Sequence, residues 1–415
     1  MTEQGVGRVL VIGAGLGGLT LAHALVRAGL DVRVYEADDG SGERFQGYRI
    51  GLAEPGLTAL RASLPQRLYE LVEATSGDLT GPGLLFDEQL TLLSRDLEGP
   101  VEGSRAVDRQ VLRRILLGDL GDRVTHGKRL TGVVEGAAAR SAHGAERAGG
   151  SASARFADGA GGTVTARFAD GTEATGAVLV GADGGNSVVR RYLAPEVGLV
   201  DADLCGAMGR TTITDRFLRL VPGRGTMVKG PGITLMLGRM QFDREPSAAA
   251  AELVPGLEMP YRDSYVRWVL LVPPEHPAAT NPGSAGEDAR ELVLELLEGW
   301  HPDLRDLVRS ADMSAVGRSK IYDRPMPPWP VGRVTLLGDS AHLTLASGGN
   351  GANTAMQDAV RLSARLAEVH RGERDLISAL GEYQDDLLER GNAAVRVGKE
   401  ALKRFVPSGP QEAAR

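Results

Sequence analysis

The chain has 415 residues, of which 42% are hydrophobic and 24% are charged, and its formal net charge is -7. One hydrophobic core does not grow to this length, so we expect two lobes, and the acidic balance excludes a basic surface that would attract nucleic acid. Cys205 is the single cysteine, which excludes an intramolecular disulfide and a cysteine-built zinc site and favours a reducing, cytoplasmic location.

The first segment, residues 8–36, predicts a strand, a glycine turn, a helix and a second strand, which together form a βαβ unit. The apolar run 9–25 within it contains glycines and His23 and is too short to cross a bilayer, so we expect no membrane span. A further helix is predicted at about 107–118, where leucines and an isoleucine share one face and arginines occupy the other.

The next segment, residues 135–162, is poor in large apolar side chains and cannot bury enough surface to join a core. We interpret the part of it that holds residues 154–159 as an extended or mobile insertion. The hexapeptide Ala-Arg-Phe-Ala-Asp-Gly occurs at 154–159 and again at 166–171, which indicates a short duplication within a hairpin. The second copy leads into the apolar run 177–181, which predicts a buried strand.

From about residue 205 to 330 the sequence alternates as strands do, for example at 232–238 and 265–272, with prolines at the turns. This segment is the candidate substrate lobe. The segments after it predict a buried strand at 333–338, an amphipathic helix at 352–369, one more helix at 374–405 and a frayed tail after Pro407.

The glycine turn has the pattern Gly13-Ala-Gly15-Leu-Gly-Gly18, and Glu36 closes the strand that follows the helix. Such glycines let the backbone approach a pyrophosphate whose charge the helix N-terminus stabilises, while the carboxylate accepts from ribose hydroxyls. The register of strand, helix and acidic residue therefore predicts a dinucleotide site. The pattern does not separate NAD from FAD, and Glu36 disfavours NADP as the resident dinucleotide.

Two later motifs each place an aspartate directly after a buried strand. The first runs from Val178 through Asp183-Gly184 to Arg190, and the second is Gly338-Asp339-Ser-Ala-His342 with the glycine-rich segment 347–353. Either motif alone is compatible with a solvated Asp-Gly turn. Found together and in this order, the three motifs are specific evidence for a bound dinucleotide cofactor.

In these motifs and their separations, over nearly its whole length, the chain resembles the FAD-dependent aromatic hydroxylases, the group A flavoprotein monooxygenases. The resemblance implies an α/β fold in which a Rossmann-like FAD-binding lobe is interleaved with a smaller antiparallel β-sheet substrate lobe, followed by C-terminal helices. The implied domains are 1–70, 100–200 and 331–370 for FAD, 71–99 and 201–330 for substrate, and 371–415 for the C-terminal helix and tail.

The resemblance also implies roles for single residues. Glu36 would hold the adenosine ribose, Asp339 the ribityl chain, and Asp183 would lie near the pyrophosphate and the approach of the pyridine nucleotide. Arg44 and Arg109 would contact FAD, with Arg105 as the rival of Arg109. The predicted cofactor-binding set is Gly13, Gly15, Leu16, Gly18, Glu36, Arg44, Arg109, Asp183, Asp339, Gly351, Ala352 and Asn353.

Physical reasons support the last three members of that set. Reduced flavin carries negative charge around N1 and the C2 carbonyl, and a helix that starts near 351–353 would direct free N–H groups and its dipole toward this charge. The glycines before the helix remove side chains that would block the approach. The chain departs from the family where Leu345 and Ala346 replace the usual prolines and where Asn350 replaces a glutamine.

The substrate side is predicted less sharply. Arg210 either meets a phenolate or carboxylate or is solvated, and His342 more often makes a structural hydrogen bond to nearby backbone than transfers a proton. No catalytic residue is assigned, and no metal-ligand spacing is present. The candidate substrate pocket comprises Arg210, Met227, Met236, Trp268, Ala346 and Gly348.

The resemblance implies a monooxygenase with bound FAD that uses NADPH or NADH and molecular oxygen, through a C4a-hydroperoxyflavin, on an aromatic or polyketide-like molecule of secondary metabolism. Ring hydroxylation, Baeyer-Villiger insertion and epoxidation stay open, as do monomer and homodimer. A flavin-dependent halogenase is one alternative, although its Trp-x-Trp-x-x-Pro signature is missing. A non-oxygenating FAD protein is another, favoured only by Leu345 and Ala346.

Overall fold

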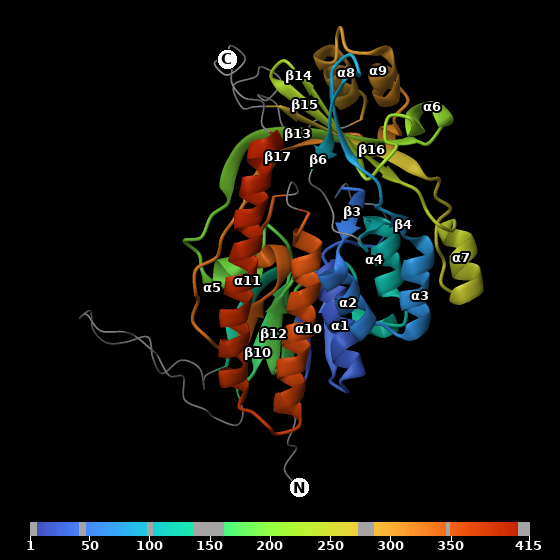
Figure 1. The fold of residues 1–415 in the computed structure, drawn as a ribbon. Helices are drawn as coiled ribbons and strands as arrows, with labels where there is room; N and C mark the ends of the chain where they lie inside the picture. The colour runs from blue at the N-terminus through green and yellow to red at the C-terminus, as the bar shows by residue number, and fades with distance from the viewer. Residues whose placement is uncertain are drawn as a thin grey trace.

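A computed structural model describes the chain in six stretches, and its ribbon forms two lobes, one above the other in Figure 1. The described residues are 6–40, 47–97, 103–136, 162–272, 286–345 and 349–405. Several predicted features lie outside them: Arg44, Ala346, Gly348, the hexapeptide at 154–159 and the tail after Pro407.

The lower lobe is built on a parallel sheet with the strand order β18-β12-β1-β2-β8. Its central strands are continuous apolar runs because both faces of the sheet are covered. The predicted βαβ unit is confirmed, since β1 and β2 pair in parallel and α1 connects them. These elements are β1 (Val9–Ile12), α1 (Leu16–Arg27), β2 (Val32–Tyr35), β8 (Val124–Thr125), β12 (Val178–Gly181) and β18 (Val334–Leu336).

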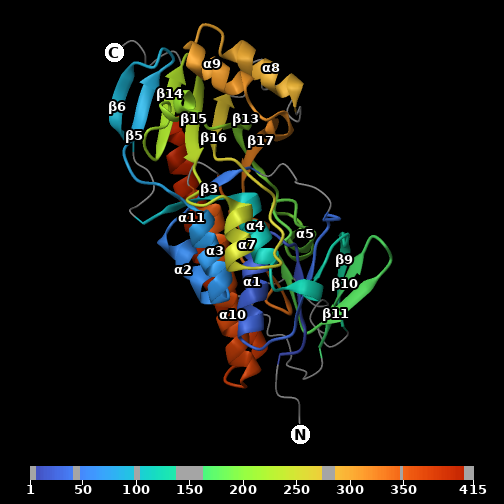
Figure 2. The same ribbon diagram turned by 90° about the vertical axis from the view of Figure 1, so that its right-hand side faces the viewer.

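Helices cover one face of this sheet and a small antiparallel sheet lies on the other, as Figure 2 shows. The second copy of the hexapeptide forms the hairpin between β10 and β11, as predicted. On the helical face, α1 contacts α10, and α10 contacts both α2 and α11. The elements are α2 (Glu54–Ser63), α10 (Gly351–His370), α11 (Leu376–Phe405), β9 (Leu130–Glu135), β10 (Val164–Phe168), β11 (Glu173–Gly176) and α5 (Val188–Leu193).

The upper lobe is built on a seven-stranded sheet with the order β17-β13-β16-β15-β14-β5-β6. The predicted antiparallel pairing holds except between β14 and β5, which run parallel. These two strands are not consecutive in the chain, so no hairpin fixes them as antiparallel. Helices α8 and α9 cover one face with a separate apolar core. The elements are β5 (Gly83–Asp87), β6 (Leu92–Leu97), β13 (Val200–Thr212), β14 (Gly225–Gly230), β15 (Ile233–Met240), β16 (Tyr265–Val272), β17 (Gly317–Asp323), α8 (Glu287–Leu296) and α9 (Pro302–Arg309).

The predicted helix at 107–118 starts later than expected. Val107 lies in the strand β7 (Arg105–Asp108), and the helix is α4 (Arg109–Leu117). Its N-terminus is fixed by Asp108, whose carboxylate accepts from the backbone N–H of Gln110 at 2.9 Å and of Val111 at 3.0 Å. The remaining elements are β3 (Arg49–Leu52), α3 (Gln66–Thr75), β4 (Gly77–Asp78), α6 (Asp215–Leu218) and α7 (Pro246–Leu253).

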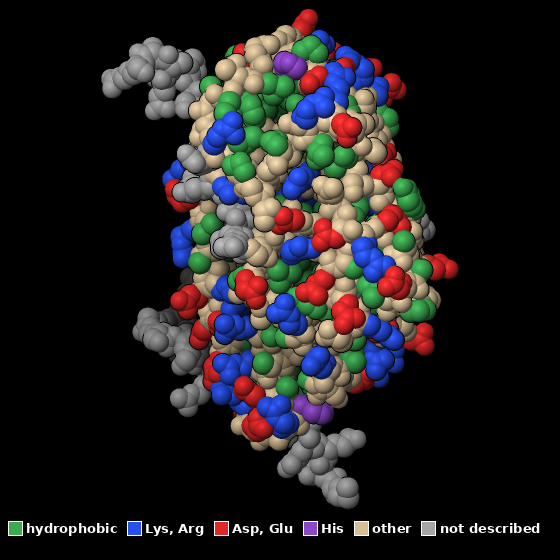
Figure 3. Space-filling view, turned by 45° about the vertical axis from the view of Figure 1, so that its right-hand side comes forward, with side chains coloured by type: hydrophobic (Ala, Val, Ile, Leu, Met, Phe, Trp, Pro, Cys, Tyr) green, Lys and Arg blue, Asp and Glu red, His purple; other side chains and the backbone are tan. Residues whose placement is uncertain are grey.

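The long helix α11 reaches from the lower lobe to the upper one in Figure 1. Near its C-terminal end, the Nζ of Lys399 lies 3.1 Å from the Oδ1 of Asp323 at the end of β17. Lys and Arg side chains are intermingled with Asp and Glu on the face that Figure 3 shows. No helix among the described stretches combines the length and the apolar character that a bilayer crossing needs. The predicted interleaved α/β fold is confirmed.

Candidate cofactor and substrate site

A single continuous cavity of about 1410 Å³ is lined by residues of both lobes. It passes from the glycine turn before α1, past the start of α10, to the seven-stranded sheet. Of the predicted cofactor residues, all that the structure describes line it: Gly13, Gly15, Leu16, Gly18, Glu36, Arg109, Asp183, Asp339, Gly351, Ala352 and Asn353. Arg44 lies outside the described residues.

The glycines of the first motif have two different functions in the structure. Gly13 has a φ of +108°, and a Cβ there would lie 2.3 Å from the carbonyl oxygen of Ala182. A Cβ on Gly18 would lie 2.2 Å from the carbonyl oxygen of Gly13, so both glycines permit close packing of the turn. At Gly15 a Cβ would have no neighbour within 4 Å. Its bare backbone faces the cavity at the N-terminus of α1, which fits a diphosphate.

Glu36 directs its carboxylate into the same end of the cavity. Its Oε2 accepts from the N–H of Ala14 at 2.7 Å, and its Oε1 accepts from the N–H of Asp38 at 3.0 Å. The guanidinium of Arg113 lies 3.9 Å away and also donates to the carbonyl of Ala14. Since an ionised carboxylate has about four acceptor sites, Glu36 keeps capacity for ribose hydroxyls.

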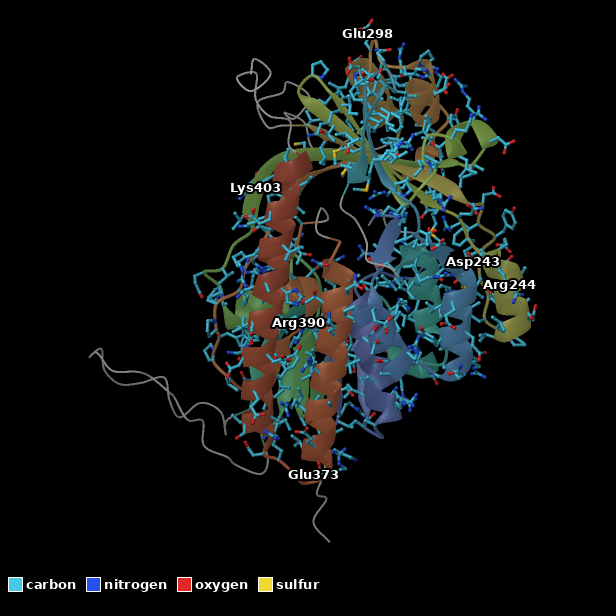
Figure 4. The ribbon with its side chains drawn as sticks, viewed as in Figure 1. Asp243, Arg244, Glu298, Glu373, Arg390 and Lys403 are labelled. Carbon is cyan, nitrogen blue, oxygen red and sulfur yellow. The ribbon has the colours of Figure 1, made fainter. Side chains whose placement is uncertain are left out.

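Arg109 and Asp339 both line the cavity. Burial lowers the pKa of the Arg109 guanidinium, and the charge of Asp339 opposes this shift, so the two groups interact. The rival Arg105 does not line the cavity. It donates to Ser76 at 2.9 Å and pairs with Asp243, which Figure 4 labels near α7. The preference for Arg109 agrees with this placement.

Asp183 lines the cavity, but its carboxylate is already engaged with the protein. It accepts from the Ser187 hydroxyl and from the N–H of Val188 at 2.6 Å, and so holds the start of α5. Burial raises the pKa of Asp183. The structure therefore gives this aspartate a role in shaping the turn that faces the cavity.

Arg324 joins the second and third motifs, and sequence reasoning missed it. This fully buried arginine follows β17 and donates to the carbonyls of Gly185 at 2.7 Å, Asp339 at 2.6 Å and Ser340 at 3.1 Å. Burial lowers its pKa to about 10, which leaves it charged at neutral pH. A residue of the upper lobe thus fixes two backbone turns of the lower lobe. In the sequence it follows the mostly polar strand 317–323, so no local pattern distinguished it.

Asn353 ties the N-terminus of α10 to β3. Its Nδ2 donates to the carbonyls of Gly51 and Gly349, each at 3.0 Å, and its Oδ1 accepts from the N–H of Ala53 at 2.9 Å. A Cβ on Gly56 would lie 2.3 Å from that Oδ1. The Asn353 side chain itself is bound to protein. A contact of this helix start with the flavin would therefore come from its backbone N–H groups, and this role stays a prediction.

A buried charged cluster lies beneath the third motif. The Nε2 of His342 is 2.6 Å from the Oδ2 of Asp358, which also accepts from the N–H of Gly338 at 2.9 Å. Arg390, which Figure 4 shows on α11, donates to the Oδ1 of Asp358 at 2.8 Å. His342 is therefore structural, as predicted, but its partner is a side chain of α10 and not nearby backbone.

Burial alone would lower the pKa of His342, but the charge and hydrogen bond of Asp358 outweigh burial and raise it. Burial would likewise raise the pKa of Asp358, and His342 and Arg390 hold it below its ordinary range. The charges of His342, Asp358 and Arg390 therefore compensate one another. Through Gly338 and His342 the cluster holds the segment 338–342 of the third motif.

At the sheet end, one face of the strands lines the cavity. Met227 and Met236 are cross-strand partners on that face, and both line the cavity as predicted. Trp268 does not. It is fully buried on the opposite face of β16, in the core under α8 and α9, since alternate residues of a strand point to opposite faces. Ala346 and Gly348 lie outside the described residues.

Arg210 also lies away from the cavity lining. Its Nη2 lies 2.8 Å from Asp312, and its guanidinium stacks over the rings of Tyr48 at 5.2 Å and Tyr265 at 5.9 Å. Its side chain is 14% exposed and does not line the cavity, and the carboxylate that it meets belongs to Asp312. The proposed contact of Arg210 with substrate is therefore not supported by this placement. The arginines that do line the sheet end are Arg49, Arg224 and Arg267, which sequence reasoning missed.

Comparisons with known proteins place these features in a family. The family described as FAD binding domain matches residues 129–397, more than half of the chain, and the family described as NAD(P)-binding Rossmann-like domain matches residues 11–70. The two matches together include all three predicted motifs.

Individual relatives agree with these matches. Dual O-methyltransferase/FAD-dependent monooxygenase CTB3 of Cercospora beticola is 29% identical over 433 residues, covering 96% of this chain and 46% of that protein. Aurachin C monooxygenase/isomerase of Stigmatella aurantiaca is 28% identical over 395 residues, covering 92% of this chain and 86% of that protein. The chain thus spans about half the length of several curated relatives that it matches, CTB3 among them.

Among solved structures, a protein described as an FAD containing monooxygenase from Photorhabdus luminescens has a TM-score of 0.77 and 26% identity, covering 96% of this chain and 98% of that chain. The family match confirms FAD as the predicted cofactor, and the glycine turn, Glu36 and the bare Gly15 backbone fit that group. This chain therefore belongs to the FAD binding domain family, in agreement with its resemblance to the FAD-dependent aromatic hydroxylases.

Proposed function

We propose that this protein is a monooxygenase that uses FAD, NADPH or NADH, and molecular oxygen to oxidise an aromatic or polyketide-like small molecule. The observation that carries the proposal is the continuous cavity, which joins a dinucleotide-binding turn to an apolar sheet face. A protein that only stored a flavin would not need the second compartment. The names of CTB3 and of the aurachin C enzyme, both monooxygenases, support the same activity.

The two lobes would divide the work. Gly15 and the N-terminus of α1 would hold the diphosphate, Glu36 the adenosine ribose, and Asp339 with Arg109 the ribityl end. The N–H groups at 351–353 would stabilise negative charge on the flavin ring. When bound, the flavin supplies electron transfer from the nicotinamide and activation of oxygen.

The sheet end would bind and orient the substrate. Leu85, Met227 and Met236 give this part of the cavity an apolar surface that excludes water. We further propose the division into FAD-binding segments 1–70, 100–200 and 331–370, substrate-binding segments 71–99 and 201–330, and a C-terminal segment 371–415. The role in secondary metabolism and the monomeric or homodimeric state belong to the same proposal.

The test is NADPH and NADH oxidation in air by the FAD-loaded protein, with and without aromatic and polyketide-like compounds. We expect oxidation that a compound stimulates, with one atom of labelled oxygen recovered in the product. If neither NADPH nor NADH reduces the flavin in the absence of oxygen, with any compound of that panel, this result would falsify the proposal and favour the non-oxygenating alternative. Neither the family match nor the relatives described above support the halogenase alternative.

A further inference from the structure

Two arginines from distant parts of the chain converge at the sheet end of the cavity. Arg49 lies on β3 of the lower lobe and Arg267 on β16 of the upper lobe, and both line the cavity. A Cβ on Gly238 would lie 2.9 Å from the Nη1 of Arg49 and 3.4 Å from the Nη2 of Arg267. The absence of a side chain at Gly238 therefore lets both guanidiniums lie against the same point of β15.

These guanidiniums have little compensation from the protein. Their Nε atoms are buried without a hydrogen-bond partner, and no described carboxylate forms an ion pair with either side chain. Among the described residues, the one hydrogen bond of this pair runs from the Nη2 of Arg49 to the carbonyl of Arg224 at 3.3 Å. Burial and the charge of Arg267 lower the pKa of Arg49 to about 9. Two adjacent buried cations are costly unless an anion joins them.

The neighbouring Arg210 provides a comparison within the same sheet. It is the cross-strand partner of Arg267 on β13, and unlike Arg267 it has Asp312 at 2.8 Å. Among the described residues, the carboxylates that line the cavity are Glu36, Asp38, Asp183 and Asp339, and all of them follow strands of the parallel sheet in the lower lobe. The described part of the cavity wall therefore supplies no anion to Arg49 and Arg267.

We propose that Arg49 and Arg267 together bind an anionic oxygen of the substrate, either a carboxylate or an ionised phenol or enol. This inference rests on the proposed function, because it assigns the substrate end of the same cavity. The guanidiniums offer several N–H donors, and Met227, Met236 and Leu85 provide an apolar surface on the same sheet face. The substrate class is thus a flat apolar molecule with one acidic group.

The diphosphate of FAD is a poor candidate for this anion. The glycine turn that fits it packs against Ala182 at the end of β12, whereas the arginine pair rests on Gly238 of the seven-stranded sheet. Figure 1 shows β12 in the lower lobe and β15, the strand of Gly238, in the upper lobe. The flavin and its phosphates would therefore leave the arginine pair for the second ligand.

The first experiment measures binding of matched probes to the FAD-loaded protein by equilibrium dialysis. The carboxylate probes are 2-naphthoate and anthracene-2-carboxylate, each compared with its neutral carboxamide, and 4-nitrophenol compared with 4-nitrobenzyl alcohol tests the phenol arm. We expect at least one acidic probe to bind roughly tenfold to a hundredfold more tightly than its neutral partner. We expect R267M and R49M to remove this preference without weakening the neutral probe.

The control is R239M, because Arg239 lies next to Gly238 on β15 but does not line the cavity. It removes a nearby positive charge and should keep the preference within about twofold, as expected when no direct contact is lost. If no acidic probe is preferred by the native protein, or if R239M abolishes the preference as fully as R267M, the inference is wrong. Preference in the carboxylate arm or in the phenol arm identifies the acidic group.

A second measurement needs no ligand. Removing an uncompensated buried charge should leave the unfolding temperature of the FAD-loaded protein unchanged or raise it in R267M, whereas an arginine with a structural role would lower it clearly. A clear fall would overturn the inference. Both measurements are independent of turnover, so the anion site can fail while NADPH still reduces the flavin, and it can hold while the proposed oxygenation fails.

Discussion

The two ends of the cavity differ in how they handle charge. At the cofactor end, Glu36 and Asp183 accept hydrogen bonds from backbone N–H groups, and Arg113 donates to a carbonyl. At the sheet end, Arg49 and Arg267 lie together, and no carboxylate in the described stretches pairs with them. The cofactor end is thus organised by the protein itself, whereas the sheet end is completed only by what binds there. Residues with unsatisfied buried charge are consequently the better guide to substrate chemistry.

The sharpest way to break this comparison is to separate packing from cofactor contact within the glycine turn. In G13A the new Cβ meets the Ala182 carbonyl at a left-handed φ, so we expect a loss of about 3 kcal/mol or more of unfolding free energy. In G15A the Cβ has open space, so we expect the apoprotein to keep its stability while FAD binding weakens. Urea unfolding and flavin titration measure the two effects. Equal destabilisation of both apoproteins would contradict this division.

The next largest effect is expected at Arg324, which stabilises the cofactor end from the upper lobe. R324M leaves carbonyls of Gly185, Asp339 and Ser340 without their donor, so we expect a loss of about 2–3 kcal/mol and a weaker affinity for FAD. R333M is the control, since Arg333 donates to one carbonyl, that of Ala177, and does not line the cavity. The measurement is the amount of flavin that R324M and R333M retain on dilution. An effect of R333M as large as that of R324M would contradict the role of Arg324 in stabilising the cofactor end.

Paired buried charges should respond to pH in a defined direction. The pKa of His342 is raised above its ordinary value of 6.5 in the folded protein. The stabilisation by protonated His342 is therefore complete below pH 6.5 and is lost as the pH rises through the raised pKa. We expect the unfolding free energy to fall over that window, because the folded protein holds the proton of His342 more tightly than the unfolded chain does. H342N should flatten the profile, and an unchanged decline in H342N would refute the cause.

The smallest effect is expected at Arg210, the compensated neighbour of Arg267. R210M removes the ion pair with Asp312 and the stacking on Tyr48 and Tyr265, which together contribute about 1 kcal/mol. Because Arg210 does not line the cavity, we expect no change in the affinity for an acidic probe. Thermal unfolding and equilibrium dialysis of R210M beside R267M give the contrast. Loss of probe binding in R210M would place the anion site elsewhere.

Local patterns were sufficient to predict the cofactor end. The strand, glycine turn, helix and Glu36 follow one another within a short stretch, so their spacing alone indicates where they meet. The aspartates of the later motifs follow apolar strands, and parallel strands bring their carboxyl ends to one edge. The helix start at about residue 107 was predicted from the apolar pattern alone, whereas the structure starts the helix at Arg109, after the N-cap residue Asp108.

The sheet end depends on tertiary contacts that no local pattern contains. Arg49 and Arg267 meet only because β3 and β16 belong to different lobes that enclose one cavity. Trp268 could have been excluded, since Arg267 and Trp268 are adjacent on one strand and must face opposite sides. The partner of Arg210 was likewise hidden, because Asp312 comes from a loop far along the chain.

The position of Arg324 also limits how this protein can be recombined. Arg324 belongs to the sheet lobe by sequence, but its guanidinium contacts the turns at Gly185 and Asp339 in the nucleotide-binding lobe. In a chimera that joins a foreign sheet lobe to this nucleotide-binding lobe, the foreign lobe would need an arginine directly after its last strand, at the position of Arg324. Without it, the backbone carbonyls of Gly185 and Asp339 would lose their donor, and the chimera would bind its coenzyme less well whatever the specificity of the new lobe.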